Sequence, residues 1–488
     1  MLDSVIPSSQ ELIRFLPETI LTLAGTLVMV LTPFTPPRRS KLLGHFAILA
    51  FLAALAATAV AYATPGEAFS RMLVVDGFAT FFRVILLVVG ILTVLSSCEY
   101  LEREGGEQGE FVALLLFSIV GQSVMATANE LIMIFIGIEI SSIASYVLAG
   151  YFRDDRRGTE AAVKYFLLGS FATAFILYGV AWIYGLTGST NLSTIRAAVL
   201  AAHGGPAHLL VAVAAGLMLV GLAFKVSAAP FQVWAPDVYQ GAPSPVSGFL
   251  SAGPKAAAFA VFLRVFMTAF EPISGRWEPM VWMAALLSMV IGNFAALTQS
   301  NIKRMLAYSS IAHAGYVLVA LSARSQVGTA AAMFYLASYA LMNVGAFAVV
   351  THFSRKGEKF QNIEDFAGLG RRQPFTAAMF TIFLFSLIGV PLTGGFFGKF
   401  YIFKAALESG LVWLSILGLL NSAVAAYYYL RILVVMYMHE PGDTTESLAP
   451  LHPGVAAALV LSAASVLYLG IFPGTVLSFA SRAAALVR

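Results

Sequence analysis

Gly221-Leu-Ala-Phe-Lys225-Val-Ser-Ala-Ala-Pro230 is a stretch of apolar helix that carries a lysine and, five residues later, a proline. A second stretch, Ser386-Leu-Ile-Gly-Val-Pro391-Leu-Thr-Gly-Gly-Phe-Phe-Gly-Lys399, again joins a helix-breaking segment to a single lysine. An ammonium group in hydrocarbon costs about 3 kcal/mol on translocon scales, and more in simulations. Membrane proteins place such groups beside broken helices chiefly where they line a route for ions or protons. The two stretches therefore indicate a membrane protein with an ion route.

The composition is that of a polytopic membrane protein. Hydrophobic residues make up 59% of the 488 residues and charged residues only 11%, whereas a soluble domain has about 25% charged residues. The start, Met1-Leu-Asp-Ser-Val-Ile-Pro7, carries no basic segment and no small-residue cleavage site. We therefore expect the first apolar span to be retained as a membrane helix.

Few residues could hold a redox cofactor. The single cysteine, Cys98, excludes internal disulfides, cysteine-ligated iron–sulfur clusters and c-type haem attachment. Only His313 and His352 of the seven histidines fall within apolar spans, too few for paired haem ligation across several helices. No Gly-x-Gly-x-x-Gly motif follows a strand pattern, so a dinucleotide site has no support. We predict that this chain binds no cofactor itself.

Apolar runs of about 20 residues predict an all-α polytopic membrane protein with fourteen transmembrane helices. The runs lie near residues 12–32, 43–63, 76–97, 110–127, 130–150, 160–186, 208–240, 243–268, 277–298, 303–322, 326–353, 374–405, 411–438 and 452–482. The seventh and twelfth are too long for one straight crossing and contain proline, which removes a helical hydrogen bond and clashes with the preceding turn. We expect each of these two to form two half-helices with an unwound middle.

The basic residues predict the orientation. Loops that follow odd-numbered spans carry fourteen of the 29 lysines and arginines, whereas the other face, including both termini, carries eight. The positive-inside rule therefore places both termini outside. The remaining seven basic residues fall within spans, and among the 25 acids only Glu139 is predicted to sit well inside one.

Spans four to eight and nine to thirteen form two sets of five, each with its broken helix fourth. An odd number of crossings inverts the second set relative to the first, which is the inverted-repeat plan of many transporters. The predicted segments are three transmembrane helices in 1–109, the first repeat in 110–270, the second in 271–440, and a last transmembrane helix in 441–488.

Several ionisable residues are predicted to share one depth. At a rise of about 1.5 Å per residue, Glu139 lies about 14 Å into its span, His313 about 15 Å and Lys255 about 18 Å. All three are then close to the middle of a hydrocarbon layer about 30 Å thick. Lys225 and Lys399 adjoin unwound segments, which must line a wet or protein-buried cavity. Such a layer, parallel to the membrane, suits a chain of proton transfers better than a single substrate pocket.

Each of these residues also has a structural interpretation. Glu139 could neutralise a lysine in a structural ion pair, although buried pairs add little net stability. Lys255 could cap a local helix break, and His313 could be a hydrogen-bonded core histidine. Lys164 lies four residues after Glu160 and could snorkel to the membrane edge.

Three arginines, Arg83, Arg264 and Arg431, also fall within spans. We expect them to snorkel or to contact lipid headgroups. Arginine cannot release its proton under working conditions, which makes it a poor member of a proton relay.

Three stretches together resemble one family, the antiporter-like membrane subunits of proton-pumping NADH:quinone oxidoreductase (respiratory complex I), and within it subunit N. They are Lys225-Val-Ser-Ala-Ala-Pro-Phe-Gln-Val-Trp-Ala-Pro-Asp-Val-Tyr-Gln-Gly-Ala-Pro-Ser-Pro-Val246, Asn301-Ile-Lys-Arg-Met-Leu-Ala-Tyr-Ser-Ser-Ile-Ala-His-Ala-Gly-Tyr316 and Gly389-Val-Pro-Leu-Thr-Gly-Gly-Phe-Phe-Gly-Lys399. The resemblance covers essentially the whole chain.

The resemblance implies a proton relay and a place for each of its members. By this match Glu139 and Lys225 correspond to the input ion pair, Lys255 to the central lysine and Lys399 to the exit-side lysine. Lys164 and His313 match further polar positions on the same axis.

The resemblance also implies a setting for the chain. The complex uses NADH, FMN, iron–sulfur clusters and quinone in other subunits, and none of these is expected here. The expected partners are the other membrane and peripheral subunits, including paralogous antiporter-like subunits, together with lipids, and no nucleic acid. The expected location is the bacterial inner membrane.

Two other classes of function share some of these features. A secondary Na⁺/H⁺ antiporter subunit of the Mrp type would have the same fold and lysines, but a sodium site needs more buried carboxylates or hydroxyl clusters than one glutamate supplies. A purely structural membrane subunit would not need a central layer of titratable groups.

Overall fold

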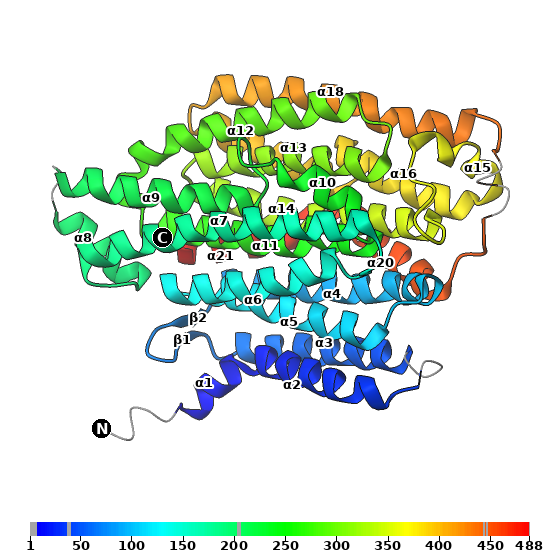
Figure 1. Cartoon of the computed structure of the whole chain (residues 1–488). Coiled ribbons are helices and arrows are strands. Elements are labelled where there is room, and N and C mark those ends of the chain that lie inside the picture. Colours follow the sequence, from blue (N-terminus) through cyan, green and yellow to red (C-terminus); the bar gives the residue numbers. More distant parts are fainter. Residues whose placement is uncertain (1–6, 37–40, 203–205, 443–444, 446–447, 488) are drawn as a thin grey trace.

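Membrane-length helices dominate the computed structural model, which describes residues 7–36, 41–202, 206–442, 445 and 448–487 (Figure 1). Within that part of the chain, thirteen helices are long and apolar enough to cross a membrane. They are α2 (Leu16–Leu31), α3 (Lys41–Tyr62), α4 (Gly77–Glu104), α5 (Gln108–Thr127), α6 (Leu131–Ala149), α7 (Arg156–Thr187), α9 (Pro206–Lys225), α11 (Ser244–Thr268), α12 (Ser274–Leu297), α13 (Ile302–Ser322), α14 (Gln326–Phe353), α18 (Val412–Met438) and α20 (Pro453–Ile471). The half-helices α16 (Pro374–Ile388) and α17 (Gly394–Glu408) make up a further, broken crossing. The predicted all-α membrane fold is confirmed.

Short elements connect the crossings. They are α1 (Ser9–Arg14), the antiparallel strands β1 (Gly66–Ala68) and β2 (Leu73–Val75), α8 (Leu192–Ala201), α10 (Trp234–Gly241), α15 (Leu369–Arg372), α21 (Pro473–Ala484), and the 3₁₀ turns at Thr32–Phe34, Glu271–Ile273, Ile363–Phe366 and Ala485–Val487. Of these elements, α10 falls in the second half of the predicted broken span 208–240 and α21 falls in the predicted span 452–482. The others were not predicted from the sequence, because each is too short to give a periodic apolar signal.

Both predicted helix breaks are present. After α9 ends at Lys225, residues 226–233 leave the helix before α10 begins, and Ser288 of α12 accepts a hydrogen bond of 2.8 Å from the amide of Ala229. After α16 ends, Gly389 adopts a left-handed conformation (φ 94°), which only glycine takes up readily. Backbone groups freed inside a membrane must find partners within the protein, and here side chains supply them.

The last crossing is shorter than predicted. The apolar run at 452–482 was expected to form one helix, but α20 ends at Ile471 and Pro473 begins α21. Proline lacks the amide that would continue α20, and it is well suited to the first turn of a new helix. α21 packs against α4 and α14 instead of continuing the crossing.

A fully buried ion pair fastens the first helices to the bundle. Glu18 of α2 accepts hydrogen bonds from Arg83 of α4 at 2.9 and 2.8 Å, and from Ser123 of α5 at 2.5 Å. Both charged side chains are 0% exposed. Two expectations were therefore wrong, because Arg83 does not snorkel and Glu139 is not the only acid buried within a span.

The other two arginines also find acidic partners. Arg264 of α11 donates to both carboxylate oxygens of Asp76, at 3.0 Å each, and is nearly buried. Asp76 also caps α4, which ties the two helices together. Arg431 lies 3.5 Å from Glu364 and stays partly exposed. Lipid headgroups are thus not needed to explain Arg264, whose charge is paired inside the protein.

The two predicted repeats use glycines in the same way. A Cβ atom at Gly121 of α5 would lie 2.6 Å from the carbonyl oxygen of Gly137 in α6. In the second set, a Cβ atom at Gly292 of α12 would lie 2.6 Å from the amide nitrogen of Ala312 in α13. Small residues let transmembrane helices approach this closely. The exact boundaries of the four predicted segments stay a prediction.

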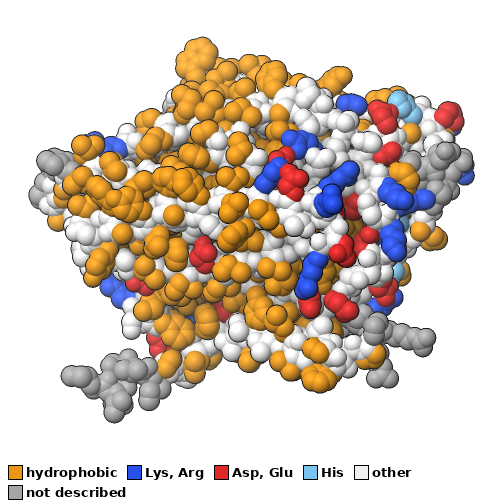
Figure 2. All heavy atoms as spheres, in the orientation of Figure 1, with side chains coloured by type: hydrophobic (Ala, Val, Ile, Leu, Met, Phe, Trp, Pro, Cys, Tyr) orange, Lys and Arg blue, Asp and Glu red, His pale blue; other side chains and the backbone are white. Residues whose placement is uncertain are grey.

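Charge is distributed unevenly over the surface. Figure 2 shows Lys, Arg, Asp and Glu side chains gathered at the end of the bundle that carries α15, while hydrophobic side chains cover the middle. The opposite end carries α8 and the β1–β2 hairpin (Figure 1). This arrangement agrees with the prediction that one face of the bundle is richer in lysine and arginine than the other. Which face is cytoplasmic stays a prediction.

We predict that Gly292→Val destabilises the protein by about 1–3 kcal/mol, the usual cost of overpacking, because the new methyl groups would meet the backbone of α13. The matched control is Gly216→Val in α9, where a Cβ atom would meet nothing within 4 Å. Thermal unfolding in detergent should show a lower Tm for the first variant only. Equal Tm values for the two variants would contradict this account of the α12–α13 contact.

Candidate functional site

Lys225 is held by two hydroxyl groups of α6. Its Nζ donates to Ser142 Oγ at 2.7 Å and to Tyr146 OH at 3.3 Å. These residues lie one and two helical turns beyond Glu139. Within the described residues, no hydrogen bond or ion pair joins Lys225 to Glu139 directly, although the charge of Glu139 reaches Lys225. The resemblance implied a direct ion pair between Glu139 and Lys225. In the structure the Lys225 ammonium donates to Ser142 instead.

Glu139 lies at the edge of the bundle. It is partly buried, and its Oε1 is buried with no hydrogen-bond partner among the described atoms. Ile136, Ile140 and Ile143 on the same helix are exposed. Glu139 thus stands between the buried interior and a bare apolar face of α6, where a charge on a neighbouring protein could act on it.

A cluster of serines separates Lys225 from the next lysine. Ser118 of α5 lies within hydrogen-bond distance of Ser141 and Ser145 of α6, at 3.2 and 3.3 Å. A small cavity beside them, bounded by Lys225 and by Pro254 of α11, leaves about 10 Å³ for the centre of a water molecule. That is close to the space one water needs.

Lys255 is buried at the centre of the bundle. Its Nζ donates to the carbonyl oxygen of Ser310 at 3.0 Å and to Ser310 Oγ at 2.5 Å. The side chain follows Pro254, which stands inside α11, and only 2% of it is exposed. No acidic side chain is bonded to Lys255 among the described residues, so its charge is compensated only by dipoles.

His313 bridges two tyrosines. Its Nδ1 lies 2.5 Å from the hydroxyl of Tyr335 in α14, and its Nε2 lies 3.2 Å from the hydroxyl of Tyr429 in α18. Tyr429 also bonds Ser309, the residue before the partner of Lys255. A neutral imidazole donates from one nitrogen and accepts at the other. The line of polar groups therefore continues from Lys255 past His313.

Lys399 closes the line at the second helix break. Its Nζ donates to the carbonyl oxygens of Leu387 and Ile388, at 3.0 and 2.9 Å, and to Ser422 Oγ at 2.9 Å. Those carbonyls are free because α16 ends there. The ammonium also lies 4.9 Å from the ring centre of Tyr316, which is one helical turn beyond His313. A groove of about 500 Å³ runs from Lys399 towards Glu408 at the end of α17.

Lys164 lies apart from this line. Its ammonium is 2.7 Å from Glu160 and 3.0 Å from Asp237, and the side chain is 43% exposed. Asp237 also bonds Arg304 at 2.7 Å. The structure thus places Lys164 in a partly exposed ionic cluster near the charged end of the bundle, as the snorkelling interpretation expected, and not in the buried layer. Its part in a relay stays a prediction.

The sequence did not reveal the groups that connect the lysines. Tyr335 and Tyr429 lie in apolar helices and look like ordinary core aromatics, and Ser310 looks like a small packing residue. Hydroxyl residues do recur in the sequence near the predicted depth of His313, but this pattern is only a weak indication of a polar line. Their role becomes visible only when four helices are brought together.

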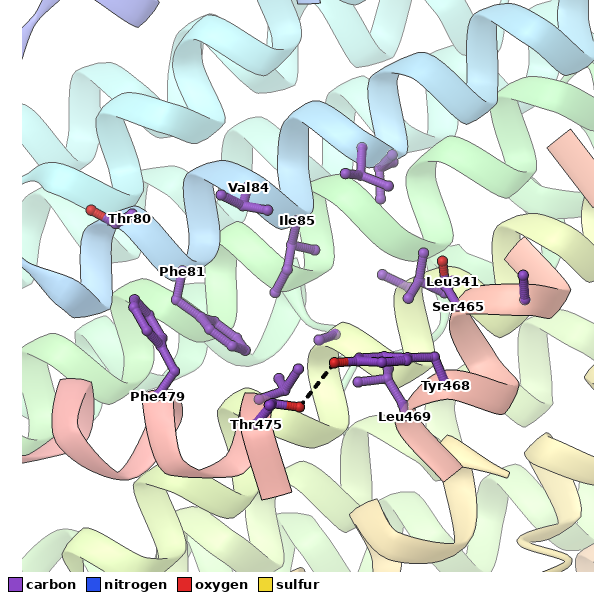
Figure 3. Close-up of a pocket in the computed structure, with 16 residues that line it drawn as sticks. Thr80, Phe81, Val84, Ile85, Leu341, Ser465, Tyr468, Leu469, Thr475 and Phe479 are labelled. Atoms are coloured by element: carbon purple, nitrogen blue, oxygen red, sulfur yellow. Dashed lines mark hydrogen bonds between the residues drawn. The ribbon is translucent and has the colours of Figure 1, made fainter. Parts of the chain in front are cut away.

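An apolar groove of about 770 Å³ lies elsewhere, between α4, α14, α20 and α21. Figure 3 shows its side chains, among which Tyr468 and Thr475 share a hydrogen bond of 3.1 Å. Its lining carries no ionisable carboxylate, amine or imidazole. It is therefore not part of the line of buried polar groups.

A bundle with two broken helices, each beside a lysine, and an interior line of hydroxyls and one imidazole defines an antiporter-like, ion-translocating membrane protein. The comparisons agree with that class. Residues 128–425 match the family model described as NADH:quinone oxidoreductase/Mrp antiporter, TM.

Individual relatives give a finer assignment. NADH-quinone oxidoreductase subunit N 1 of Solibacter usitatus is 68% identical, with 98% of each chain covered. A chain in the respiratory complex I of Thermus thermophilus is 36% identical, with 95% of this chain and 99% of that chain covered and a TM-score of 0.80. The Mrp complex of Dietzia sp. contains a chain of the same fold, with a TM-score of 0.86, 21% identity and coverage of 98% and 97%. This chain belongs to the subunit N family of NADH-quinone oxidoreductase.

Proposed function

We propose that this chain translocates protons as a membrane-arm subunit of NADH:quinone oxidoreductase, coupled to quinone reduction elsewhere in the complex. The observation that carries the proposal is the buried line from Lys225 through Lys255 and His313 to Lys399, in a chain whose full length matches subunit N. Each hydroxyl and the imidazole along the line can both donate and accept a proton.

The electrostatics suggest how a distant event drives the relay. A nearby carboxylate favours the charged form of Lys225, whereas burial favours the neutral amine. If a charge outside α6 weakens the electrostatic attraction between Glu139 and Lys225, the Lys225 ammonium keeps only its hydrogen bonds to Ser142 and Tyr146. Its proton is then driven towards Lys255 through the serine cluster and a water in the small cavity.

The second half of the relay ends at the helix break. A proton that leaves Lys255 passes Ser310, the neighbouring Ser309 and Tyr429 to reach His313. From there Lys399 receives it, with water bridging the remaining gap. Lys399 is bonded only to neutral acceptors, so it can take up and release a proton without breaking an ion pair.

The setting follows from the same proposal. The partners would be the other membrane and peripheral subunits of the complex, with Glu139 facing one membrane neighbour across the bare side of α6. NADH, FMN, iron–sulfur clusters and quinone would be bound by other subunits. The location would be the bacterial inner membrane, with both termini on the outer side, because the loops at the opposite end are richer in lysine and arginine.

We predict that Lys225→Ala lowers proton pumping and quinone-linked NADH oxidation by about tenfold or more, because a positioned proton-transfer group contributes at least that much. Glu139→Gln should act in the same direction. Lys41→Ala is the control, since that lysine is half exposed and pairs with Glu102, away from the line of relay residues. Pumping is measured in proteoliposomes after native gels confirm assembly. Normal pumping by an assembled Lys225→Ala complex would remove Lys225 from the relay.

Lys399→Arg separates a relay from a fixed charge. Arginine keeps the positive charge and much of the packing but cannot cycle its proton. We predict that Lys399→Arg impairs pumping almost as strongly as Lys399→Ala, while Lys41→Arg has no effect. Pumping that arginine restores and alanine does not would mean that Lys399 acts as a fixed charge and that the relay ends elsewhere.

The Mrp-type antiporter is the second candidate, because its solved complex shares the fold. The two candidates predict different companions and different ions. We expect the chain to be isolated in mild detergent with NADH-oxidising subunits, and its proton transport to be unchanged when Na⁺ is removed. Isolation with cation-antiporter subunits alone, together with Na⁺-dependent transport, would favour the antiporter.

A further inference from the structure

A polar cleft of about 760 Å³ opens at the charged end of the bundle, away from the relay residues. Unlike the groove in Figure 3, it is lined by charged side chains and by backbone. Its lining includes Tyr100, Glu104, Arg153, Gln240, Gly357 and Glu358. The cleft therefore admits water to the loops that follow α4, α6, α10 and α14.

An ion pair lies at the floor of this cleft. Lys303 of α13 donates to Glu358 at 2.6 Å and to the carbonyl oxygen of Ala242 at 2.5 Å. The Lys303 side chain is 0% exposed, whereas that of Glu358 is 15% exposed. Glu358 also accepts from the hydroxyl of Tyr100 at 2.8 Å and from the amide of Ser244 at 2.7 Å. The carboxylate thus meets the cleft on one side and the start of α11 on the other.

The backbone is strained to place this carboxylate. Glu358 has a φ of 48°, a left-handed conformation that is uncommon for residues other than glycine. Its amide bonds the carbonyl of Arg355 at 2.7 Å, and the preceding Gly357 amide donates to Glu104 at 2.8 Å. Strained backbone of this kind persists where surrounding contacts over-determine it, often at functional sites.

The charge state of Glu358 follows from its partners. Burial alone would raise its pKa, but the Lys303 ammonium and the hydrogen bonds from Lys303, Ser244 and Tyr100 outweigh burial and hold the pKa below its ordinary value. The group therefore stands as a carboxylate, partly exposed to the cleft and bonded to the start of α11.

A row of polar side chains leads from the floor of the cleft to Lys255. Ser244, Ser247, Ser251 and Lys255 recur at three- and four-residue intervals on α11 and so share one face. The row is about 16 Å long at 1.5 Å per residue. Asn343 of α14 donates to Ser251 at 2.5 Å beside this row.

Among the described residues, three buried polar atoms along or beside the row have no hydrogen-bond partner: Ser244 Oγ, Tyr239 OH and Asn343 Oδ1. The Tyr239 hydroxyl lies near Ser310, the residue that accepts from Lys255, but makes no hydrogen bond of good geometry to it. Buried groups left without partners are sites where waters bind in proteins. Waters bound to these atoms would connect the cleft with Lys255.

We propose that Glu358 is the uptake group at which protons from the cleft enter the line to Lys255, an inference that rests on the proposed function. A hydronium ion in the cleft gives its proton to the Glu358 carboxylate and becomes water. The carboxylic acid then passes that proton to a water beside Ser244 and is restored as a carboxylate. Lys303 positions Glu358, and its charge drives the proton onward.

The test replaces Glu358 by glutamine, which keeps the shape but cannot take up a proton. In assembled complex in proteoliposomes, Glu358→Gln should lower pumping by about tenfold or more. Glu364→Gln is the matched control, because that glutamate is in the same connection, exposed, and paired with Arg431 and His439. Pumping by Glu358→Gln at the control rate would overturn the proposal.

Chemical rescue distinguishes proton uptake from a structural role. A small carboxylic acid such as formic acid fits the cleft and can deliver protons where the side chain no longer does. We expect millimolar formate to restore at least part of the pumping in Glu358→Gln and to leave Glu364→Gln unchanged. Failure of formate to raise pumping in an assembled Glu358→Gln complex would assign Glu358 a structural role.

A double variant guards against misfolding. Glu358→Gln leaves Lys303 as an unpaired buried charge, which can destabilise the protein, whereas Glu358→Gln with Lys303→Met is neutral. The double variant should assemble normally and still pump slowly. Full pumping by the double variant would show that Glu358 serves only to neutralise Lys303.

Lys255→Ala, measured in parallel, separates this proposal from the proposed function. If Lys255→Ala abolishes pumping and Glu358→Gln does not, the relay stands and only the uptake site is wrong. If both variants pump normally, the proposed function itself fails.

Discussion

The rest of the structure depends on one constraint, the cost of leaving a polar group without a partner inside hydrocarbon. Two helices break within the membrane, and each break releases carbonyls and amides that must be satisfied. At the second break the released carbonyls of Leu387 and Ile388 accept from Lys399, so the break and the buried ammonium stabilise one another. At the first, Ser288 satisfies the amide of Ala229, and Lys225 turns to the hydroxyls of α6. A lysine beside a broken helix is therefore a single structural unit, used twice.

Buried charges are treated in two different ways in this fold. Arg83 with Glu18, and Arg264 with Asp76, are fully paired and tie helices together. Lys255 and Lys399, by contrast, are bonded to hydroxyls and carbonyls and to no described carboxylate. A paired arginine is a permanent charge, whereas a lysine held by neutral dipoles can gain and lose its proton. The structural charges are thus arginines paired with carboxylates, whereas the candidate relay consists of lysines bonded to neutral groups.

The proposed relay would have two ends as well as a middle. Glu139 stands at a bare face of α6, open to the influence of a neighbouring protein, and Lys399 stands beside a groove at the other end of the line. Glu358 offers a third connection, from the cleft at the charged end of the bundle. Subunit N relatives over the full length of the chain make a shared assembly the natural setting for such connections.

The sequence by itself determined the class of the protein, the membrane crossings and the two helix breaks, because these follow from local hydrophobicity and from proline. It also singled out Lys225, Lys255, Lys399 and His313, since ionisable residues in apolar runs are conspicuous. Only the tertiary structure decided which groups they touch. Tyr335, Tyr429 and Ser310 come from different helices and carry no local signal, and Glu358 lies in a loop that reads as solvated. Local pattern likewise could not show that Glu18 pairs with Arg83 across the bundle, that Asp237 joins Lys164 in its partly exposed cluster, or that Lys225 is bonded to Ser142. Those outcomes depend on how helices pack, and side-chain partners across helices are set by that packing alone.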